Sequence, residues 1–125
     1  MIALYADSNG KEIKISGTKD EWQVFAKMLR TDMGEVKCKT VEDPSPYSAA
    51  AQKILVHYDN SSKVTIDVNS EGNIFISGSP KVCAEMSDAI QSFASEFQPG
   101  EHFHMDYIDS HFIEEQSALV VLYME

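Results

Sequence analysis

The chain has 125 residues, 43% of them apolar, and its 20 acidic and 10 basic residues give it a formal charge of −10. This length and apolar content are enough for one domain with its own core. The acidic balance argues against binding to nucleic acid or to an anionic membrane, both of which require a basic face, but it is compatible with a basic protein partner.

Two strands are predicted before residue 18. Apolar residues alternate with polar ones across 2–6, and "IKISG" at 13–17 has the same period of two, which is typical of strands with one buried face. Between them, Asn9-Gly10 suits a tight hairpin turn. We therefore expect an antiparallel pair of strands here.

A helix is predicted to follow directly. Thr18 and Glu21 have the spacing of a capping box, in which a hydroxyl and a carboxylate bind free amides at the start of a helix. Large apolar side chains then fall on one helical face, so we expect them in the core: Trp22, Phe25, Ala26 and Leu29.

Two more strands are predicted at 35–40 ("EVKCKT") and 53–59 ("KILVHYD"). The segment 42–52 between them contains Pro44 and Pro46, which favour a turn or a loop. Ser45 before Pro46 is also a suitable start for a short helix from Tyr47 to Gln52. The pattern does not decide between the loop and the helix.

The second half of the chain repeats this plan. "IFISG" begins at residue 74 and "IKISG" at residue 13, an offset of 74 − 13 = 61 residues. Alternating apolar residues at 64–68 and a turn at Gly72 precede it, as in the first half. Two strands are again predicted after the helix, at 102–107 and 119–123.

The second helix is predicted to begin after Ser79, with Pro80 as its first residue, where a missing N–H costs nothing. Pro99-Gly100 is expected to end it. Its apolar face is predicted to pack into the core: Val82, Met86, Ile90, Phe93 and Phe97.

These elements predict an α+β fold in one domain, residues 1–125. We expect a mostly antiparallel sheet from two ββαββ repeats, 1–59 and 63–125, with two helices packed on one face. The continuous apolar run at 119–123 suggests a central strand with contacts on both faces.

The two cysteines and the chain start bear on the cellular compartment. Cys38 and Cys83 have neither metal-type nor redox spacing, so we expect reduced, half-buried core thiols. The first residues lack a secretory signal, and the apolar stretch 118–124 is too short to span a bilayer. We therefore expect a cytoplasmic protein.

The strand at 102–107 concentrates polar groups of chemical interest. His102, His104 and Asp106 alternate with Phe103, Met105 and Tyr107, so the two sets point to opposite faces, with the apolar set beneath the helices. Two imidazoles and a carboxylate are ligand types of zinc and iron sites, and His57, Asp109 or His111 could add further ligands. His-x-His alone is a weak signal for a metal site.

Signals of catalysis are weaker still. No serine lies in Gly-x-Ser-x-Gly, and no glycine-rich loop has the spacing that holds a phosphate group. Cys38 lies in an alternating strand, where an inert thiol is the usual occupant. The acidic pairs, 106 with 109 and 114 with 115, are expected in a chain with 20 acidic residues.

A recognition surface is the third interpretation of this strand. If one sheet face is covered by helices, the other mixes imidazole, carboxylate and aromatic groups, as protein–protein interfaces do. A merely solvated sheet face is the competing interpretation. The side chains expected on this face are His57, Asp67, Phe75, His102, His104 and Asp106.

Several motifs then occur in a familiar order: Ile-Ser-Gly at 15–17 and 76–78, "DPSPY" at 43–47, "GEHFHMDY" at 100–107 and the terminal "ALVVLYM". Over most of its length the chain resembles family thirty-two of the immunity proteins of bacterial polymorphic toxin systems. It departs where family members have a proline-rich stretch and this chain has "IDSHFIEEQSA", so no contact residue is transferred. The resemblance implies a small domain that binds and blocks a cognate toxin and has no catalytic residues.

We therefore expect an immunity protein, not an enzyme, that binds the C-terminal domain of a cognate toxin and occludes its active site. A nuclease is the hypothesised toxin activity, because an acidic inhibitor can mimic a phosphate backbone. We expect no catalytic residues, metal ligands or cofactor, and a monomer or weak dimer. The residues predicted to bind the toxin are Tyr47, Asp106, Tyr107, Asp109, His111, Glu114 and Glu115.

Two alternatives stay open at this point. One is a small metal-dependent enzyme that uses His102, His104 and Asp106. The other is an oligomerisation module in which an open sheet face pairs with a second copy of the chain.

Overall fold

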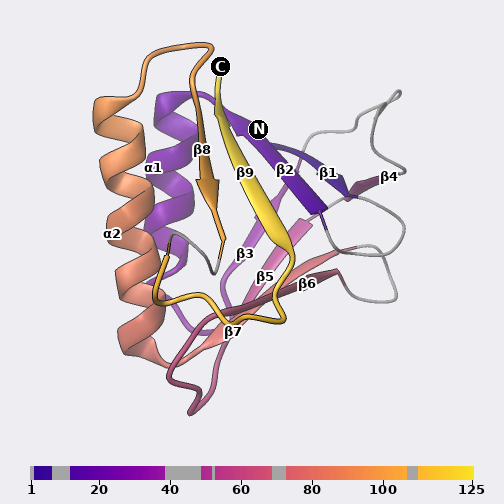
Figure 1. The fold of residues 1–125 in the computed structure, drawn as a ribbon, viewed down its shortest axis with the longest axis vertical. Helices are drawn as coiled ribbons and strands as arrows, with labels where there is room; N and C mark the ends of the chain where they lie inside the picture. Colours follow the sequence, from indigo (N-terminus) through magenta and orange to yellow (C-terminus); the bar gives the residue numbers. More distant parts are fainter. Residues whose placement is uncertain (1, 7–11, 39–48, 52, 69–72, 107–109) are drawn as a thin grey trace.

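In the part of the chain that the structure describes, two helices lie side by side on one side of the molecule and two β-sheets lie on the other (Figure 1). The computed structural model describes residues 2–6, 12–38, 49–51, 53–68, 73–106 and 110–125. The helices are α1 (Lys19–Met28) and α2 (Pro80–Glu96). The predicted α+β class and the packing of two helices against the sheet layer are confirmed.

The strands form a five-stranded sheet and a four-stranded sheet rather than the single sheet that was expected. The five-stranded sheet has the order β4 (Ala49–Ala51), β1 (Ala3–Ala6), β2 (Glu12–Gly17), β9 (Leu119–Met124) and β8 (His102–Met105). The four-stranded sheet has the order β3 (Glu35–Lys37), β5 (Lys53–Tyr58), β7 (Ile74–Gly78) and β6 (Thr65–Val68).

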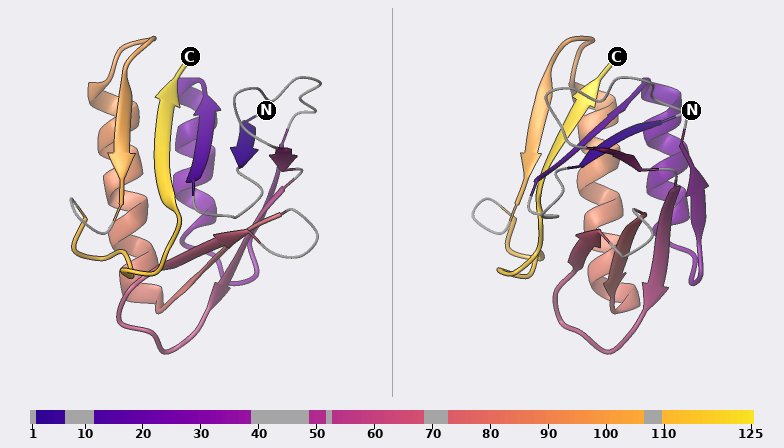
Figure 2. Two further views of the ribbon diagram at one scale, coloured as in Figure 1. Left: turned by 45° about the vertical axis from the view of Figure 1, so that its right-hand side comes forward. Right: turned by 90° about the vertical axis from the view of Figure 1, so that its right-hand side faces the viewer.

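Exchange of strands between the two halves of the chain explains why there are two sheets. β2 pairs with β9 and β5 pairs with β7, both in parallel register, whereas the other pairs are antiparallel. Each half therefore supplies strands to both sheets, and the sheet layer is mostly antiparallel, as predicted. Figure 2 shows the two sheets inclined to each other in front of the helices.

The two sheets share one arrangement. The order β1-β2-β9-β8 and the order β6-β7-β5-β3 both run antiparallel, parallel, antiparallel. Among the described strands, β4 has no counterpart in the second half of the chain. The description of the chain as two ββαββ repeats stays a prediction.

Local capping fixes where both helices begin, as the sequence predicts. The Thr18 hydroxyl accepts a bond from the Glu21 amide (3.3 Å), and the Glu21 carboxylate accepts one from the Thr18 amide (3.0 Å). The Ser79 hydroxyl accepts a bond from the Val82 amide (3.3 Å), with Pro80 as the first helical residue. The predicted stop at Pro99-Gly100 lies just beyond the end of α2, and Gly100 has a φ of 92°.

The predicted apolar faces of both helices form the core, apart from Phe97, which is only half-buried. The Trp22 and Phe93 rings pack edge to face with centroids 5.3 Å apart, and the Trp22 indole N–H donates to the Tyr123 carbonyl (3.1 Å). Burial of each such side chain contributes about 1.5–3 kcal/mol. Neither described helix has the length and apolarity needed to cross a membrane.

One local prediction is corrected, and part of a segment that the sequence left open is assigned. β9 buries only one face (Val120, Leu122 and Met124), and Leu119 is 42% exposed, because the described elements leave the outer face of the five-stranded sheet open. Residues 49–51 form strand β4 rather than part of a helix, because the edge of β1 pairs with them. Several predicted features lie outside the described residues: the segment 42–48, residue 52, and the turns at Asn9-Gly10 and Gly72.

Candidate binding surface

Strand β8, at the edge of the five-stranded sheet, carries the predicted histidines. His102 and His104 are exposed, whereas Phe103 is half-buried and Met105 is fully buried, so the predicted alternation is confirmed. Phe103 lies against Phe97, with ring centroids 5.8 Å apart. The histidines therefore face outward because the apolar residues between them are held inside.

An aromatic row crosses the outer face of this sheet. The His102 ring stacks on Tyr123 with centroids 5.3 Å apart, and it packs edge to face against His104 at 5.2 Å. The ammonium of Lys14 lies 4.5 Å from the centre of the Tyr123 ring and 5.1 Å from that of Tyr5. Each exposed cation–π contact contributes about 0.5–1 kcal/mol, so the row is held in place before any partner arrives.

The predicted outer face is divided between the two sheets. His57 and Phe75, whose ring centroids are 6.4 Å apart, lie on the four-stranded sheet together with Asp67. His102 and His104 lie on the other sheet. The expectation of one continuous face was wrong because it assumed one sheet, whereas β5, β6 and β7 form a second one.

The His102, His104 and Asp106 set does not form a metal site in this structure. Among the described residues, which include these three, no three His, Cys, Asp or Glu side chains lie close enough together to hold a metal ion. The two imidazoles contact each other and Tyr123 instead of converging with the carboxylate on one point.

The acidic segment 110–118 crosses from β8 towards the four-stranded sheet and is fixed there by backbone hydrogen bonds. The Val64 amide donates to the Phe112 carbonyl (2.7 Å), the Glu114 amide to the Val64 carbonyl (2.7 Å) and the Ala118 amide to the Ile66 carbonyl (3.0 Å). The Phe112, Ile113 and Ala118 side chains are buried, which anchors the segment from below.

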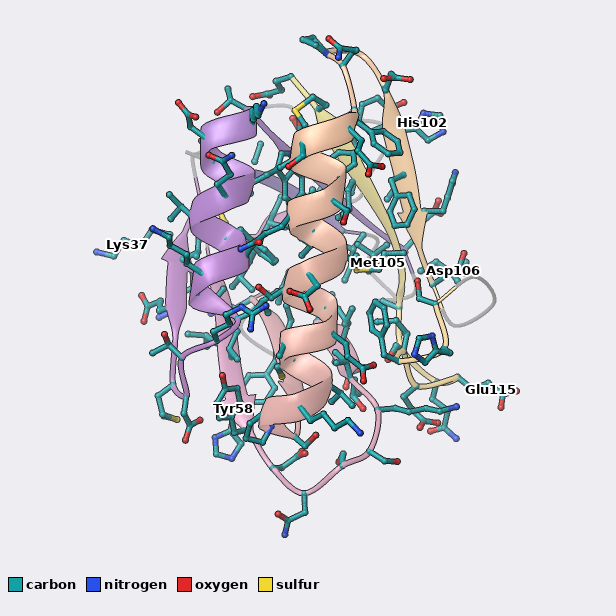
Figure 3. All side chains as sticks on the ribbon, turned by 90° about the vertical axis from the view of Figure 1, so that its left-hand side faces the viewer. Lys37, Tyr58, His102, Met105, Asp106 and Glu115 are labelled. Carbon is teal, nitrogen blue, oxygen red and sulfur yellow. The ribbon has the colours of Figure 1, made fainter. Side chains whose placement is uncertain are left out.

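Segment 110–118 presents several of the predicted binding residues to solvent. Glu115 is exposed, Glu114 is half-buried, and the His111 side chain is 89% exposed with Nε2 3.5 Å from the Glu85 carboxylate on α2. Asp106 is half-buried at the start of the connection, where its carbonyl accepts a bond from the Ser110 amide (2.9 Å). Figure 3 shows His102, Asp106 and Glu115 along one margin of the molecule.

The structure thus brings together four of the seven predicted residues, Asp106, His111, Glu114 and Glu115, on one connection. Tyr47, Tyr107 and Asp109 lie outside the described residues. Sequence reasoning missed the part of the aromatic row in which Lys14 lies over the rings of Tyr5 and Tyr123. Their alternation within strands was a visible signal, but it did not show which strands are neighbours.

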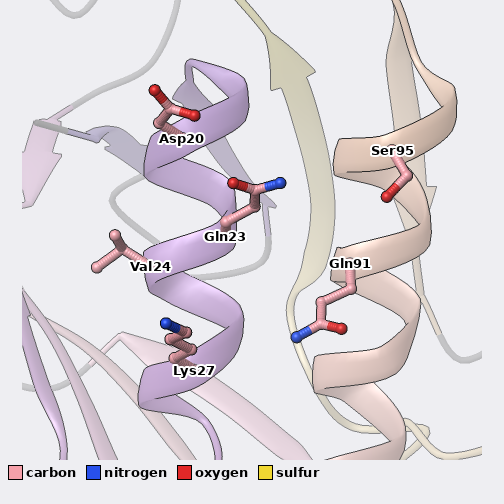
Figure 4. A pocket seen from close by; sticks show the side chains of 6 residues that line it. All are labelled: Asp20, Gln23, Val24, Lys27, Gln91 and Ser95. Atoms are coloured by element: carbon pink, nitrogen blue, oxygen red, sulfur yellow. The ribbon is translucent and has the colours of Figure 1, made fainter.

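A groove between the two helices is a second surface feature that sequence reasoning missed (Figure 4). Its lining is polar apart from Val24, which is 60% exposed. Side chains from both helices line it: Asp20, Gln23, Val24, Lys27, Gln91 and Ser95. These groups could form hydrogen bonds with a partner, but nothing in their types indicates a reaction.

The two cysteine thiols are protonated at neutral pH. Burial raises the pKa of Cys38 to about 12 and that of Cys83 to about 11, the latter with help from Asp59 and Asp32. Both thiols are free, and Cys83 is the more deeply buried of the two. The prediction of free thiols at the core is confirmed, although Cys83 is fully buried rather than half-buried.

No protein-family model, curated protein or solved structure matches the chain.

Proposed function

We propose that this protein is an immunity protein that binds the C-terminal domain of a cognate bacterial toxin and occludes its active site. The observation that carries the proposal is the acidic segment 110–118. Its backbone is bonded to Val64 and Ile66, while Glu114 and Glu115 remain accessible to solvent. The motif order that resembles immunity proteins supports the same function.

The hydrogen bonds of this segment matter because a protein inhibitor acts through affinity rather than turnover. A loop that is ordered before binding loses little conformational entropy when a partner docks, and the saved free energy appears as tighter binding. Tight inhibition also requires slow dissociation, which well-packed contacts provide.

Charge supports a basic partner. The chain carries a formal charge of −10, and solvent-accessible carboxylates such as that of Glu115 accelerate encounter with a positively charged cleft. We infer that the toxin is an enzyme with a basic active site, such as a nuclease. The aromatic row on the five-stranded sheet, with Tyr123 and His102, offers large flat side chains of the kind that dominate binding energy at interfaces.

Co-expression with the toxin domain encoded by the neighbouring gene tests the proposal. The wild-type protein is expected to restore growth and to form a stoichiometric complex in size-exclusion chromatography. Glu114→Gln with Glu115→Gln is expected to weaken binding about tenfold or more, because it removes two charge pairs worth roughly 1 kcal/mol each.

The matched control is Glu35→Gln with Glu96→Gln, which removes the same charge from exposed positions on β3 and α2. This control is expected to bind like the wild type. If both double variants weaken toxin binding equally, segment 110–118 contributes only through the net charge of the chain and not as a specific contact. Failure of the wild-type protein both to bind the toxin domain and to protect cells would refute the proposal.

A further inference from the structure

The turn between α1 and β3 brings three potential metal ligands together, away from the binding surface described above. Asp32 and Met33 lie in this turn, and His57 lies on β5. The Met33 Sδ atom is 3.4 Å from His57 Nδ1, and the Asp32 Oδ1 atom is 3.9 Å from the same nitrogen. A thioether and a carboxylate from the turn therefore both approach the same imidazole nitrogen of the four-stranded sheet.

Backbone bonds hold this turn against the end of β5. Asp32 Oδ1 accepts bonds from the Met33 amide (2.9 Å) and the Tyr58 amide (2.9 Å). The Gly34 carbonyl accepts a bond from the Val56 amide (2.8 Å). Residues on both sides of His57 are thus bonded to the turn that carries Met33, which holds the backbone of the imidazole residue beside that of the thioether residue.

The backbone of Met33 is strained. Its φ is 59°, and among the described residues it is the one non-glycine residue with a positive φ. This left-handed conformation costs an L-residue roughly 1–2 kcal/mol. Met33 is also 73% exposed, so burial of its apolar side chain does not offset the strain. Strain retained at an exposed residue is a reason to look for a function.

We propose that Met33, His57 and Asp32 bind a copper(I) ion. Soft thioether and imidazole ligands favour Cu(I), whereas zinc sites in proteins use thiolate, imidazole and carboxylate ligands rather than thioether. Metal–sulfur and metal–nitrogen bonds of about 2.3 and 2.0 Å at a tetrahedral angle place the two donors about 3.5 Å apart. The observed separation of 3.4 Å is close to this value.

The exposure of the donors indicates the kind of site. The side chains of His57 and Asp32 are 50% and 53% exposed, so an ion reaches them without opening the fold. Asp32 supplies a negative charge beside the ion, while its bonds to two backbone amides keep it oriented. The site is therefore one for an exchangeable ion rather than for a buried structural ion.

Silver(I), which resembles Cu(I) in its ligand preference and is not oxidised, is the probe for a direct test. The untagged full chain, with its six methionines labelled at the methyl carbon, is titrated with Ag(I) and followed by NMR. One methyl signal is expected to shift and to saturate at one ion per chain. That signal is expected to be absent in Met33→Leu, which keeps the size of the side chain but lacks the sulfur.

A second variant examines the imidazole. His57→Gln is expected to weaken Ag(I) binding at least tenfold, and competition with a Cu(I) chelator is expected to show the same loss. The matched control is His111→Gln, because His111 is also exposed but lies on segment 110–118. The control is expected to bind the ion like the wild type.

The pair His102 and His104, on the five-stranded sheet, is the alternative site for the ion. If His102→Gln with His104→Gln abolishes binding, or if His57→Gln binds as tightly as the wild type, the proposal is overturned. An unshifted Met33 methyl signal at saturating Ag(I) also overturns it. The side chains of Met33 and His57 are exposed, so Met33→Leu and His57→Gln are expected to fold. If Met33→Leu does not fold, the methyl shift in the wild-type protein and the affinity of His57→Gln for Ag(I) test the site.

Discussion

The four histidines of the chain show how neighbouring groups decide what one side chain can do. His102 and His104 contact rings on an open sheet face, whereas His111 extends into solvent beside Glu85. His57 lies against the thioether of Met33. Only the last of these arrangements combines an imidazole with a second soft donor, although all four side chains are exposed.

Cys38 gives a prediction at the scale of a single residue. The thiolate is the reactive form, and burial raises the pKa of this thiol to about 12, well above that of an ordinary cysteine. We expect its alkylation rate in the folded protein to be low at pH 7 and to rise nearly tenfold between pH 9 and pH 10. An ordinary thiol with a pKa of about 8.5 is already mostly ionised at pH 9, so its rate rises by only about a quarter over the same interval.

Alkylation with iodoacetamide across this pH range, followed by peptide mass spectrometry, measures the rate. The same peptide in urea-unfolded protein is the control and is expected to titrate like a free cysteine. A rate in the native protein that rises less than twofold between pH 9 and pH 10 would contradict the raised pKa.

At the scale of elements, local signals predicted individual helices and strands well. Thr18 and Ser79 mark the starts of both helices because capping depends only on residues three or four positions away. Alternation predicted which face of β8 is buried, for the same local reason. Such short-range chemistry can be read from one sequence.

Strand pairing could not be predicted in this way. Glu12 on β2 lies opposite Leu119 on β9, a separation of 119 − 12 = 107 residues, and no local pattern specifies that partner. The second sheet, the split of the predicted face and the approach of Met33 to His57 all follow from such long-range pairings. The sequence indicated His57 as a possible metal ligand, but no local pattern placed the Met33 thioether beside it.

Ser117 gives a prediction for the element that it anchors, segment 110–118. Its buried hydroxyl accepts a bond from the Ile66 amide (3.1 Å) and donates one to the Val64 carbonyl (3.3 Å). Ser117→Ala leaves the Ile66 amide unpaired inside the protein, so we expect a loss of about 1–3 kcal/mol in the free energy of unfolding. Urea unfolding measures this loss.

Hydrogen exchange adds a local measure of the same change. The Ile66 and Ala118 amides are expected to exchange faster in Ser117→Ala, because the segment opens more often. The matched control is Ser92→Ala on the exposed face of α2, which is expected to change the free energy of unfolding by less than about 0.5 kcal/mol. Equal stability of the two variants would show that the Ser117 bonds contribute little.

At the scale of the whole molecule, the exchange of strands makes the two halves interdependent. The first half supplies β1 and β2 to the five-stranded sheet, and β3 and β5 to the four-stranded sheet. The second half supplies β6 and β7 to the four-stranded sheet, and β8 and β9 to the five-stranded sheet. The two parallel pairs, β2–β9 and β5–β7, both join strands of different halves. The helices also meet across the halves, where the Ser87 hydroxyl donates to the Ala26 carbonyl (2.6 Å).

This interdependence gives a prediction for fragments cut in the exposed connection between β5 and β6. Residues 1–62 and 63–125 are each expected to lack a cooperative unfolding transition, because each fragment loses the central parallel partner in both of its sheets. When mixed, they are expected to form a one-to-one complex with the circular dichroism spectrum of the intact chain. The complex should melt at a lower temperature than the intact chain, and its melting temperature should rise with concentration, since assembly is then bimolecular. A cooperative thermal transition in either isolated fragment would mean that one half is a folding unit by itself, and that the parallel pairs join two finished domains rather than complete two shared sheets.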